Sequence, residues 1–552
     1  MIYYYLKYKK VFISILIFLF IIFILGFAVN NWGITGDDGG LLCHSRIKNI
    51  KDLLNFFCSD VTANNAGSPS NYQYNKQTFF AVYYRPLTYI FYYFQNIFFN
   101  YQAYYYFLFN IFLHAVNAVL LFNIFLYFSG YILAFLMALT FAFHVSMCTW
   151  LGWIASQVYQ IELFFILLII LFLKKYLESK KILYYLFALL FFLFAIFTRE
   201  LSVIMPIWLV LAFITFNCYK NNKLNFYNNF LYSFKLSLGF WFIWGFYFLL
   251  RLYFYPINNA VHSNFSINSF RFLFNRYPDF ITLISNLANQ SIYFLPGGNF
   301  KFKAILVLLY FVPFIFLFMI NKNKKYILFF IFSMCLFLWP AILHLYVDRY
   351  LYPVLPFYLI IVLILLKINY KQDNLSIILY KKIIIIFLYL LLPFDIYILR
   401  SGIKYQSISY YQKELYFNKI LNNKNLKNKK VCFLCLPAYL FYNSIAQYLW
   451  IKGFNKSFDI YYDDRTFIAH NFPEKQNNPE IIKLNNGFKF IIKDVNKQSF
   501  LTYRGNIMGN LITDKYLQDK PVELTLYLDK KYLDPDIKFI TWDYSKNEFK
   551  IL

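Results

Sequence analysis

The sequence predicts an all-α polytopic membrane protein with about eleven transmembrane helices and a small mixed α/β domain at the C-terminal end. Two observations predict the membrane part. Of the 552 residues, 60% are hydrophobic and only 14% are charged, and apolar windows of about 20 residues, the length that spans a bilayer core, recur through most of the first 400 positions. A third observation, a change to short alternating apolar runs after residue 400, predicts the separate domain.

The first span follows a basic start, MIYYYLKYKK, and reads VFISILIFLFIIFILGFAV. This apolar run is longer than a typical signal-peptide core, and no small-residue cleavage site follows it. We therefore expect an uncleaved first helix whose N-terminus stays in the cytoplasm.

Ten further spans are expected at residues 104–127, 131–148, 160–177, 182–198, 201–217, 232–251, 303–320, 326–344, 350–367 and 377–398. If successive spans cross the membrane in alternating directions, starting from a cytoplasmic N-terminus, one set of lysines lies on the cytoplasmic side, as the positive-inside rule requires. That set is Lys174, Lys175, Lys180, Lys181, Lys220, Lys223, Lys322, Lys324, Lys325, Lys367, Lys371, Lys381 and Lys382. One miscounted span would put the later lysines outside.

The predicted membrane module, residues 1–399, has two large outer loops at 30–103 and 252–302, and an extracytoplasmic domain follows at 400–552. In that domain VCFLCL, KFIIKD, ELTLYLD and IKFITWD are typical of strands, and YYQKELYFNKIL and NSIAQYLW of helices. Within the first outer loop, YYRPLTYIFYYFQNIFF suits an aromatic helix lying along the membrane interface.

The net charge of +27 would fit a nucleic-acid partner, but no basic recognition element accompanies it. Lysines that flank the cytoplasmic ends of spans, together with a general bias toward Ile, Phe, Tyr, Asn and Lys, account for the excess. We expect the lipid bilayer, and no nucleic acid, as a partner.

Charged residues that are retained beside spans are informative, because a charge at the bilayer centre costs about 2.5 to 3.5 kcal/mol on insertion scales. Each could simply mark a helix end, where charges are tolerated. However, the predicted outer ends of the spans carry carboxylates as well as arginines, and signals that only set the membrane topology would not require carboxylates. We expect them to converge in a chamber of acids and arginines that comprises Asp37, Asp38, Arg85, Glu162, Arg199, Glu200, Arg251, Asp348 and Arg349.

Polar residues also occur inside spans. Asn110, His114 and Asn117 recur at i, i+4 and i+7, so they share one helix face. They could hydrogen-bond to neighbouring helices or face a substrate, and the packing alternative is favoured for the two asparagines. Glu162 lies about one turn inside its span, and therefore requires a partner, for which an arginine of the chamber is the candidate.

Six motifs in order resemble integral-membrane glycosyltransferases of the GT-C superfamily, specifically the protein O-mannosyltransferase-like group that includes the transmembrane and tetratricopeptide-repeat mannosyltransferases. The motifs are GDDGG, YRPLTYI, NIFLHAVNAVL, WIASQ, TRELSVIMP and DRYLYPVLPF, and they cover about residues 30–360. WIASQVYQ lacks the acidic residue that relatives often place after the serine, and TRE has arginine where they often have lysine. No tetratricopeptide repeats follow.

The resemblance implies transfer of a sugar from a polyprenyl phosphate or diphosphate to a protein, lipid or glycan acceptor on the outer face, with an aspartate of the first outer loop as the base. Asp37 is favoured as that base and Asp38 as a residue that binds a partner group, because an arginine-paired carboxylate is a weaker base. Direct inverting displacement is the expected course.

A departing phosphate requires delocalised cations, for which Arg85, Arg199 and Arg349 are candidates, with Arg251 behind them. Glu200 and Asp348 are expected to orient arginines. His114 and Glu162 are expected to support the site. No cofactor is expected: a divalent ion on Asp37, Asp38 and Glu162 is chemically feasible, but the resemblance argues against a required metal.

The main alternative is a polytopic transporter or flippase of a lipid-linked saccharide, because intramembrane polar residues also mark permeation paths. We expect an enzyme in a bacterial inner membrane, with its active site and C-terminal domain in the periplasm or outside.

Overall fold

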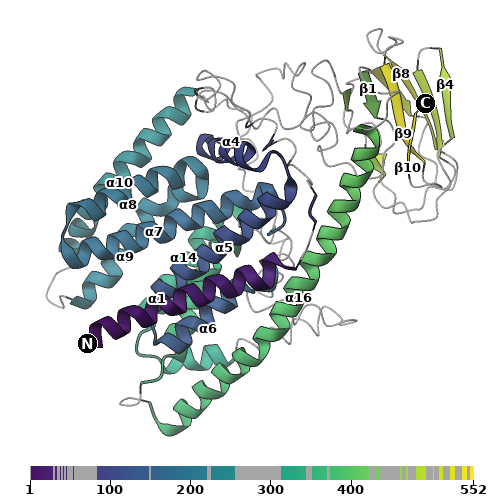
Figure 1. Cartoon of the computed structure of the whole chain (residues 1–552). Coiled ribbons are helices and arrows are strands. Elements are labelled where there is room, and N and C mark those ends of the chain that lie inside the picture. The colour runs from purple at the N-terminus through teal and green to yellow at the C-terminus, as the bar shows by residue number, and fades with distance from the viewer. Residues whose placement is uncertain are drawn as a thin grey trace.

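The computed structural model (Figure 1) describes the helical part over residues 2–28, 84–147, 151–220, 226–254, 312–343, 351–369 and 373–421. It also describes short parts of the first loop, at 31–33, 38, 41–42, 45, 54 and 57. After residue 430 it describes 430–433, 461–462, 468–469, 480–485, 487–492, 501–502, 509–513, 522–528, 537–543 and 548–551.

Most described residues before 422 are helical. The α-helices are α1 (Ile2–Ile21), α4 (Pro86–Phe99), α5 (Ala103–Phe125), α6 (Tyr131–Ala142), α7 (Gln157–Ser179), α8 (Ile182–Thr198), α9 (Met205–Lys220), α10 (Phe226–Phe254), α14 (Lys324–Leu343), α15 (Leu355–Leu366) and α16 (Leu375–Leu421). Residues 312–320 are also helical. A π-helical turn, η1 (Ile22–Gly26), extends α1, and the 3₁₀ turns are η3 (Val145–Met147), η4 (Ile154–Ser156) and η5 (Glu200–Ile204).

Five helical segments are long and apolar enough to cross a membrane: Tyr8–Gly26, Ala103–Phe125, Ile154–Ser179, Tyr227–Tyr253 and Leu375–Ile408. Four shorter apolar helices lie at Tyr131–Met147, Ile182–Thr198, Glu200–Phe216 and Leu355–Leu366. The outer faces of the bundle carry large exposed apolar side chains, as a lipid-facing surface does. The prediction of a mostly helical integral membrane protein is confirmed at this level.

Lysines gather at one end of the bundle. The ammonium of Lys9 lies 5.1 Å from the ring centroid of Tyr131, and that of Lys174 lies over the ring of Tyr127. The N-terminus of α1, the α5–α6 connection and the α7–α8 connection therefore meet at this lysine-rich end. Figure 1 shows α16 beginning toward the same part of the molecule and running past the other helices toward the strands.

Helix α16 is longer than the sequence indicates. We expected a span ending near residue 398 and a separate helix in the tail, whereas one helix of 47 residues runs from Leu375 to Leu421, across residue 400, and contains Pro393. The segment around residue 400, ILRSGIKYQS, has no proline. Its one glycine costs a helix only about 1 kcal/mol, which is too little to end it.

The strands form two four-stranded sheets and one two-stranded sheet. One sheet has the order β4 (Glu480–Leu484), β5 (Gly487–Ile492), β8 (Val522–Leu528), β7 (Gly509–Thr513) and is antiparallel throughout. Another has the order β10 (Glu548–Ile551), β9 (Ile537–Asp543), β1 (Lys430–Phe433), β2 (Tyr461–Tyr462), with β1 parallel to both neighbours. The short strands β3 (Ile468–Ala469) and β6 (Leu501–Thr502) pair with each other.

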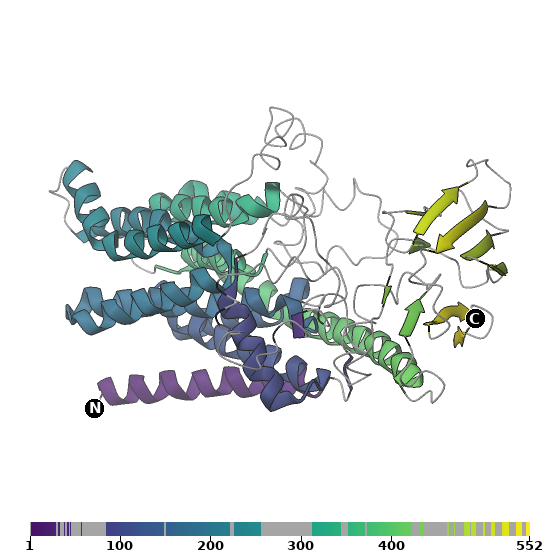
Figure 2. The ribbon, with the colours of Figure 1, turned by 90° about the horizontal axis from the view of Figure 1, so that it is seen from above.

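Strands were expected at VCFLCL, KFIIKD, ELTLYLD and IKFITWD, and β1, β5, β8 and β9 lie there. The expected helix NSIAQYLW is outside the described residues. Figure 2, seen from above, places the strands beyond the end of α16 and apart from the helices.

Candidate functional site

A buried ion pair joins α7 to the end of α8. Arg199 Nη1 donates to Glu162 Oε2 at 2.5 Å, and the Ser202 hydroxyl donates to Glu162 Oε1 at 2.8 Å. Both carboxylate oxygens are therefore hydrogen-bonded, which a buried charge requires. Helix α8 ends here because Arg199 takes an extended backbone conformation (φ −158°, ψ 141°), and η5 begins at the next residue.

The Arg199 guanidinium also lies over the ring of Tyr159, 3.9 Å from its centroid. Burial lowers the pKa of Arg199, but the charge of Glu162, the nearby Tyr159 phenol and the hydrogen bond to Glu162 together raise it by more, so the net shift is upward. Arg199 is therefore a permanently charged group that is enclosed by an aromatic ring and a carboxylate.

A second ion pair forms where α4 begins. Arg85 Nε donates to Glu200 Oε2 at 2.8 Å, and the backbone N–H of Tyr84 donates to Glu200 Oε1 at 2.7 Å. Pro86 occupies the first turn of α4, where its missing N–H costs nothing. The Thr88 hydroxyl donates to the Thr198 carbonyl at 2.9 Å and fixes α4 to the end of α8. The side chains of Arg85 and Glu200 are 18% and 19% exposed, whereas those of Arg199 and Glu162 are almost completely buried.

Arg251 reaches the same end from α10. The phenol of Tyr247 lies within electrostatic range of Arg251, one turn further along the same helix, and of Glu200. The ring of Tyr247 is 5.6 Å from the ring of Tyr84, centroid to centroid. Tyr84, just before α4, and Tyr247, on α10, therefore bring these two segments together near Glu200 of η5.

Asp38 attaches the first outer loop to this region. Its side chain is fully buried, and its Oδ1 accepts the backbone N–H of Ala155 at 2.8 Å. The neighbouring Tyr92 phenol donates to the Ile154 carbonyl at 2.9 Å. Burial raises the pKa of Tyr92, the Asp38 charge raises it further and Arg85 opposes this. Tyr92 therefore lies within electrostatic range of both the acid and the arginine.

Trp32 fixes the start of the same loop. Its indole N–H donates to the Gly152 carbonyl at 2.8 Å, and its ring stacks on Phe107 with centroids 4.3 Å apart. A Cβ at Gly152 would come within 1.7 Å of the Trp32 ring. Gly152 therefore permits this close approach, and a side chain at that position would displace the loop.

A separate polar network lies within the bundle. His114 Nε2 donates to the Ala142 carbonyl at 2.9 Å and its Nδ1 contacts the Tyr352 hydroxyl at 3.0 Å. Asn117 Nδ2 donates to that hydroxyl at 3.0 Å and to the Gln160 carbonyl at 2.9 Å. Asn110 likewise donates to the Leu151 carbonyl at 3.0 Å. These contacts favour the helix-packing alternative for the shared face of α5, His114 included.

The structure thus brings six of the ten expected site residues to one end of the bundle. These are Asp38, Arg85, Glu162, Arg199, Glu200 and Arg251. His114 belongs to the separate network. Asp37, Asp348 and Arg349 lie outside the described residues. The prediction that an arginine pairs with Glu162 is confirmed.

The sequence did not indicate Tyr84, Tyr92 or Ser202. Tyr84 and Tyr92 are two of many aromatic residues in an aromatic-rich segment. Ser202 had a weak signal, since it lies three residues after Arg199 and so falls on the same side of the turn.

No protein-family model matches the chain, and no curated protein matches it. In the part of the chain that the structure describes, no three His, Cys, Asp or Glu side chains lie close enough to hold a metal ion. What the described arrangement offers is a buried loop carboxylate, Asp38, at the same end of the bundle as the partly exposed guanidinium groups of Arg85 and Arg251, and such groups suit an anionic ligand.

Proposed function

We propose that this protein is an inverting glycosyltransferase that moves a sugar from a polyprenyl-phosphate donor to a protein, lipid or glycan acceptor. The observation that carries the proposal is that Asp38, Arg85 and Arg251 lie at the same end of a membrane helix bundle, where Asp38 and Arg85 are both within electrostatic range of Tyr92. A lipid phosphate in the bilayer surface can reach such an end directly. No cofactor or metal is part of the proposed reaction.

Asp37 is the proposed base. Asp38 is buried and holds the Ala155 N–H, so its role is to fix the loop on the start of α7. A carboxylate that already accepts a backbone N–H is a weaker base, because that hydrogen bond stabilises its charged form. The adjacent carboxylate then removes the proton of the acceptor hydroxyl as its oxygen attacks the anomeric carbon.

Arg85 and Arg251 are the proposed ligands of the leaving phosphate. Arg85 is partly exposed, and Arg251 lies in the last turn of α10 at intermediate exposure. Arg199 is enclosed by Glu162 and Tyr159, so it stabilises the negative charge of the site at longer range. Arg349 is proposed as a further phosphate ligand, oriented by Asp348, and Glu200 orients Arg85.

The reaction is a direct displacement. The acceptor oxygen forms a bond to the anomeric carbon while the bond from that carbon to the phosphate oxygen breaks, and the departing phosphate keeps the electron pair. Asp37 takes the proton, and the arginines offset the charge that accumulates on the phosphate. The product sugar has the inverted configuration.

The finer architecture that accompanies this function is a GT-C-like module over residues 1–399 with about eleven spans, followed by an extracytoplasmic α/β domain over 400–552. We place the protein in a bacterial inner membrane, with the site and the C-terminal domain outside the cytoplasm. The lysine-rich end opposite the site supports this orientation, because cytoplasmic ends carry the excess of lysine.

The alternative of a transporter or flippase is less well supported. A conduit needs polar groups that line a path at the membrane centre. The polar residues within the bundle, His114 and Asn117, instead donate to carbonyls of neighbouring helical segments and to Tyr352, and both are fully buried.

The test is to replace Asp37 and Asp38 separately with asparagine and to profile the glycans and lipid A of the host membrane. We expect Asp37→Asn to abolish the product while the protein accumulates normally, and Asp38→Asn to reduce it. Glu178→Gln is the matched control, because this exposed carboxylate lies at the lysine-rich end and pairs only with Lys174 in the described part of the chain. Unchanged products in both aspartate variants would contradict the proposal.

A further inference from the structure

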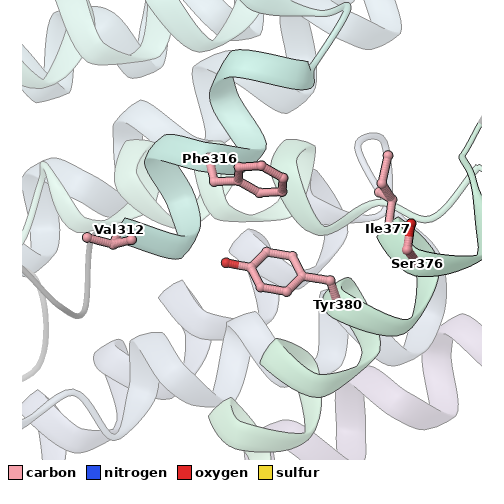
Figure 3. Close-up of a pocket in the computed structure, with 5 residues that line it drawn as sticks. All are labelled: Val312, Phe316, Ser376, Ile377 and Tyr380. Atoms are coloured by element: carbon pink, nitrogen blue, oxygen red, sulfur yellow. The ribbon is translucent and has the colours of Figure 1, made fainter.

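An open groove lies between the helical residues 312–320 and the first turns of α16 (Figure 3). Val312, Phe316, Ser376, Ile377 and Tyr380 line it, and its volume is about 460 Å³. That volume is within the range of pockets that hold a small organic ligand. The rings of Phe316 and Tyr380 meet edge to face, with centroids 5.5 Å apart. The lining is almost entirely apolar, so the occupant must present hydrocarbon.

The groove opens toward the hydrocarbon of the membrane. On the helical residues 312–320, Ile315 and Met319 are exposed, and on α16 Leu379 and Ile383 are exposed. Apolar side chains that face outward from two adjacent membrane helices contact acyl chains. A ligand that enters this groove therefore comes from the bilayer, and its buried part is a hydrocarbon chain.

The end of the groove is positively charged. Lys322, Lys324 and Lys325 follow directly after the helical residues 312–320, and all three are exposed. Phe316 is four residues, or about 6 Å along the helix axis, before Ile320, the last helical residue, and Lys322 lies in the turn that follows.

The nearby carboxylate does not cancel this charge. Asp373 Oδ2 accepts from Lys381 Nζ at 2.9 Å, and the same ammonium donates to the Lys367 carbonyl at 2.9 Å. Asp373 and Lys381 therefore neutralise each other. The lysines around the groove leave a net positive charge beside the bilayer surface, and such a charge attracts anionic lipid headgroups.

We infer that this groove binds an anionic phospholipid of the surrounding bilayer, with an acyl chain between Phe316 and Tyr380 and its phosphate on Lys322, Lys324 and Lys325. The site lies at the lysine-rich end, opposite the acid and arginine cluster, so it is separate from the proposed donor site. A bound lipid there joins the start of α16 to the preceding helices.

The test uses the full chain, purified in a mild detergent, with phosphatidylglycerol or phosphatidylcholine added at equal concentrations, and native mass spectrometry counts the retained lipids. We expect phosphatidylglycerol to bind at least about tenfold more tightly, because each lysine near the surface contributes to the attraction. The triple variant Lys322→Ala, Lys324→Ala, Lys325→Ala should remove this preference. Lys180→Ala with Lys181→Ala is the matched control, since these lysines are exposed on the α7–α8 connection and should not affect it.

A second variant tests the chain-binding part. Val312→Trp fills the groove and should reduce the retention of both lipids, whereas Leu390→Trp, an exposed position on α16 away from the groove, should leave retention unchanged. Equal binding of the two lipids by the wild-type protein overturns the inference. So does a preference for phosphatidylglycerol that survives the triple lysine substitution.

Discussion

Arg199 and Glu162 form an ion pair of 2.5 Å that is almost entirely shielded from solvent, with side-chain exposures of 4% and 0%. Both partners belong to elements that meet at the candidate site. Because neither charge can be hydrated, each depends on the other, and the pair acts as a single unit.

The first prediction follows from that dependence. Glu162→Gln should leave the Arg199 charge buried without a counter-ion and lower the free energy of unfolding by about 3 to 5 kcal/mol. Thermal unfolding in detergent measures this loss. The double variant Glu162→Gln with Arg199→Gln should be less destabilised than the sum of the two single variants, because it removes the lone charge. Additive losses would show that the two side chains are not coupled.

The second prediction concerns the more exposed pair, Arg85 and Glu200. Solvent screens this pair, so Glu200→Gln should lower stability by about 1 kcal/mol or less. Its effect on transfer should be larger than its effect on stability, because Glu200 orients a proposed phosphate ligand.

Arg85→Lys tests the same pair from the other side, because it keeps the charge but loses the planar fork of donors. We expect it to raise the apparent KM for the lipid-linked donor, measured in proteoliposomes. If Glu200→Gln lowered stability as much as Glu162→Gln, the description of the Arg85–Glu200 pair as solvent-screened would be contradicted.

The sequence predicted those features that depend on local pattern. Apolar windows predicted membrane helices, and α5 and α7 lie where two of them were expected. The cost of burying Glu162 predicted an arginine partner, although it did not identify Arg199 among the candidates. These inferences succeed because one residue and its immediate neighbours determine them.

Contacts between distant segments could not be predicted in this way. Asp38 accepts the N–H of Ala155, which is 117 residues away, and a backbone group has no signature in a sequence. The Trp32 contact with Gly152 is similar, because a single glycine also suits any turn. The sequence predicted that Asn110, His114 and Asn117 share one helix face. It could not distinguish helix packing from substrate binding, because that distinction depends on the groups to which these side chains hydrogen-bond in other segments.

The third prediction tests the close approach of the first loop. Gly152→Ala would place a Cβ 1.7 Å from the Trp32 ring, so the indole must move and lose both its hydrogen bond and its stacking on Phe107. We expect a stability loss of about 1 to 3 kcal/mol and reduced transfer, because the loop carries the aspartates. Gly245→Ala is the control, since nothing lies within 4 Å of its Cβ position in the described structure. This substitution in α10 should be neutral or slightly stabilising.

The fourth prediction separates the network within the bundle from the candidate site. Tyr352→Phe removes the hydroxyl that contacts His114 and accepts from Asn117, and leaves His114 Nδ1 without that buried partner. The expected cost is about 1 to 3 kcal/mol of stability. Tyr389→Phe is the matched control, because its hydroxyl is exposed and its bond to the Ile132 carbonyl is long, at 3.4 Å; its cost should be within about 0.5 kcal/mol.

A measurement of transfer activity distinguishes a packing role of this network from a role in the proposed reaction. If His114 and Tyr352 only pack helices together, the Tyr352→Phe protein that remains folded should transfer sugar at the wild-type rate, measured per folded molecule at a temperature well below unfolding. A rate that falls more than about tenfold in folded protein would instead link the network to the reaction, since such a fall corresponds to about 1.4 kcal/mol of lost transition-state stabilisation. His114 would then regain the supporting role that the sequence suggested.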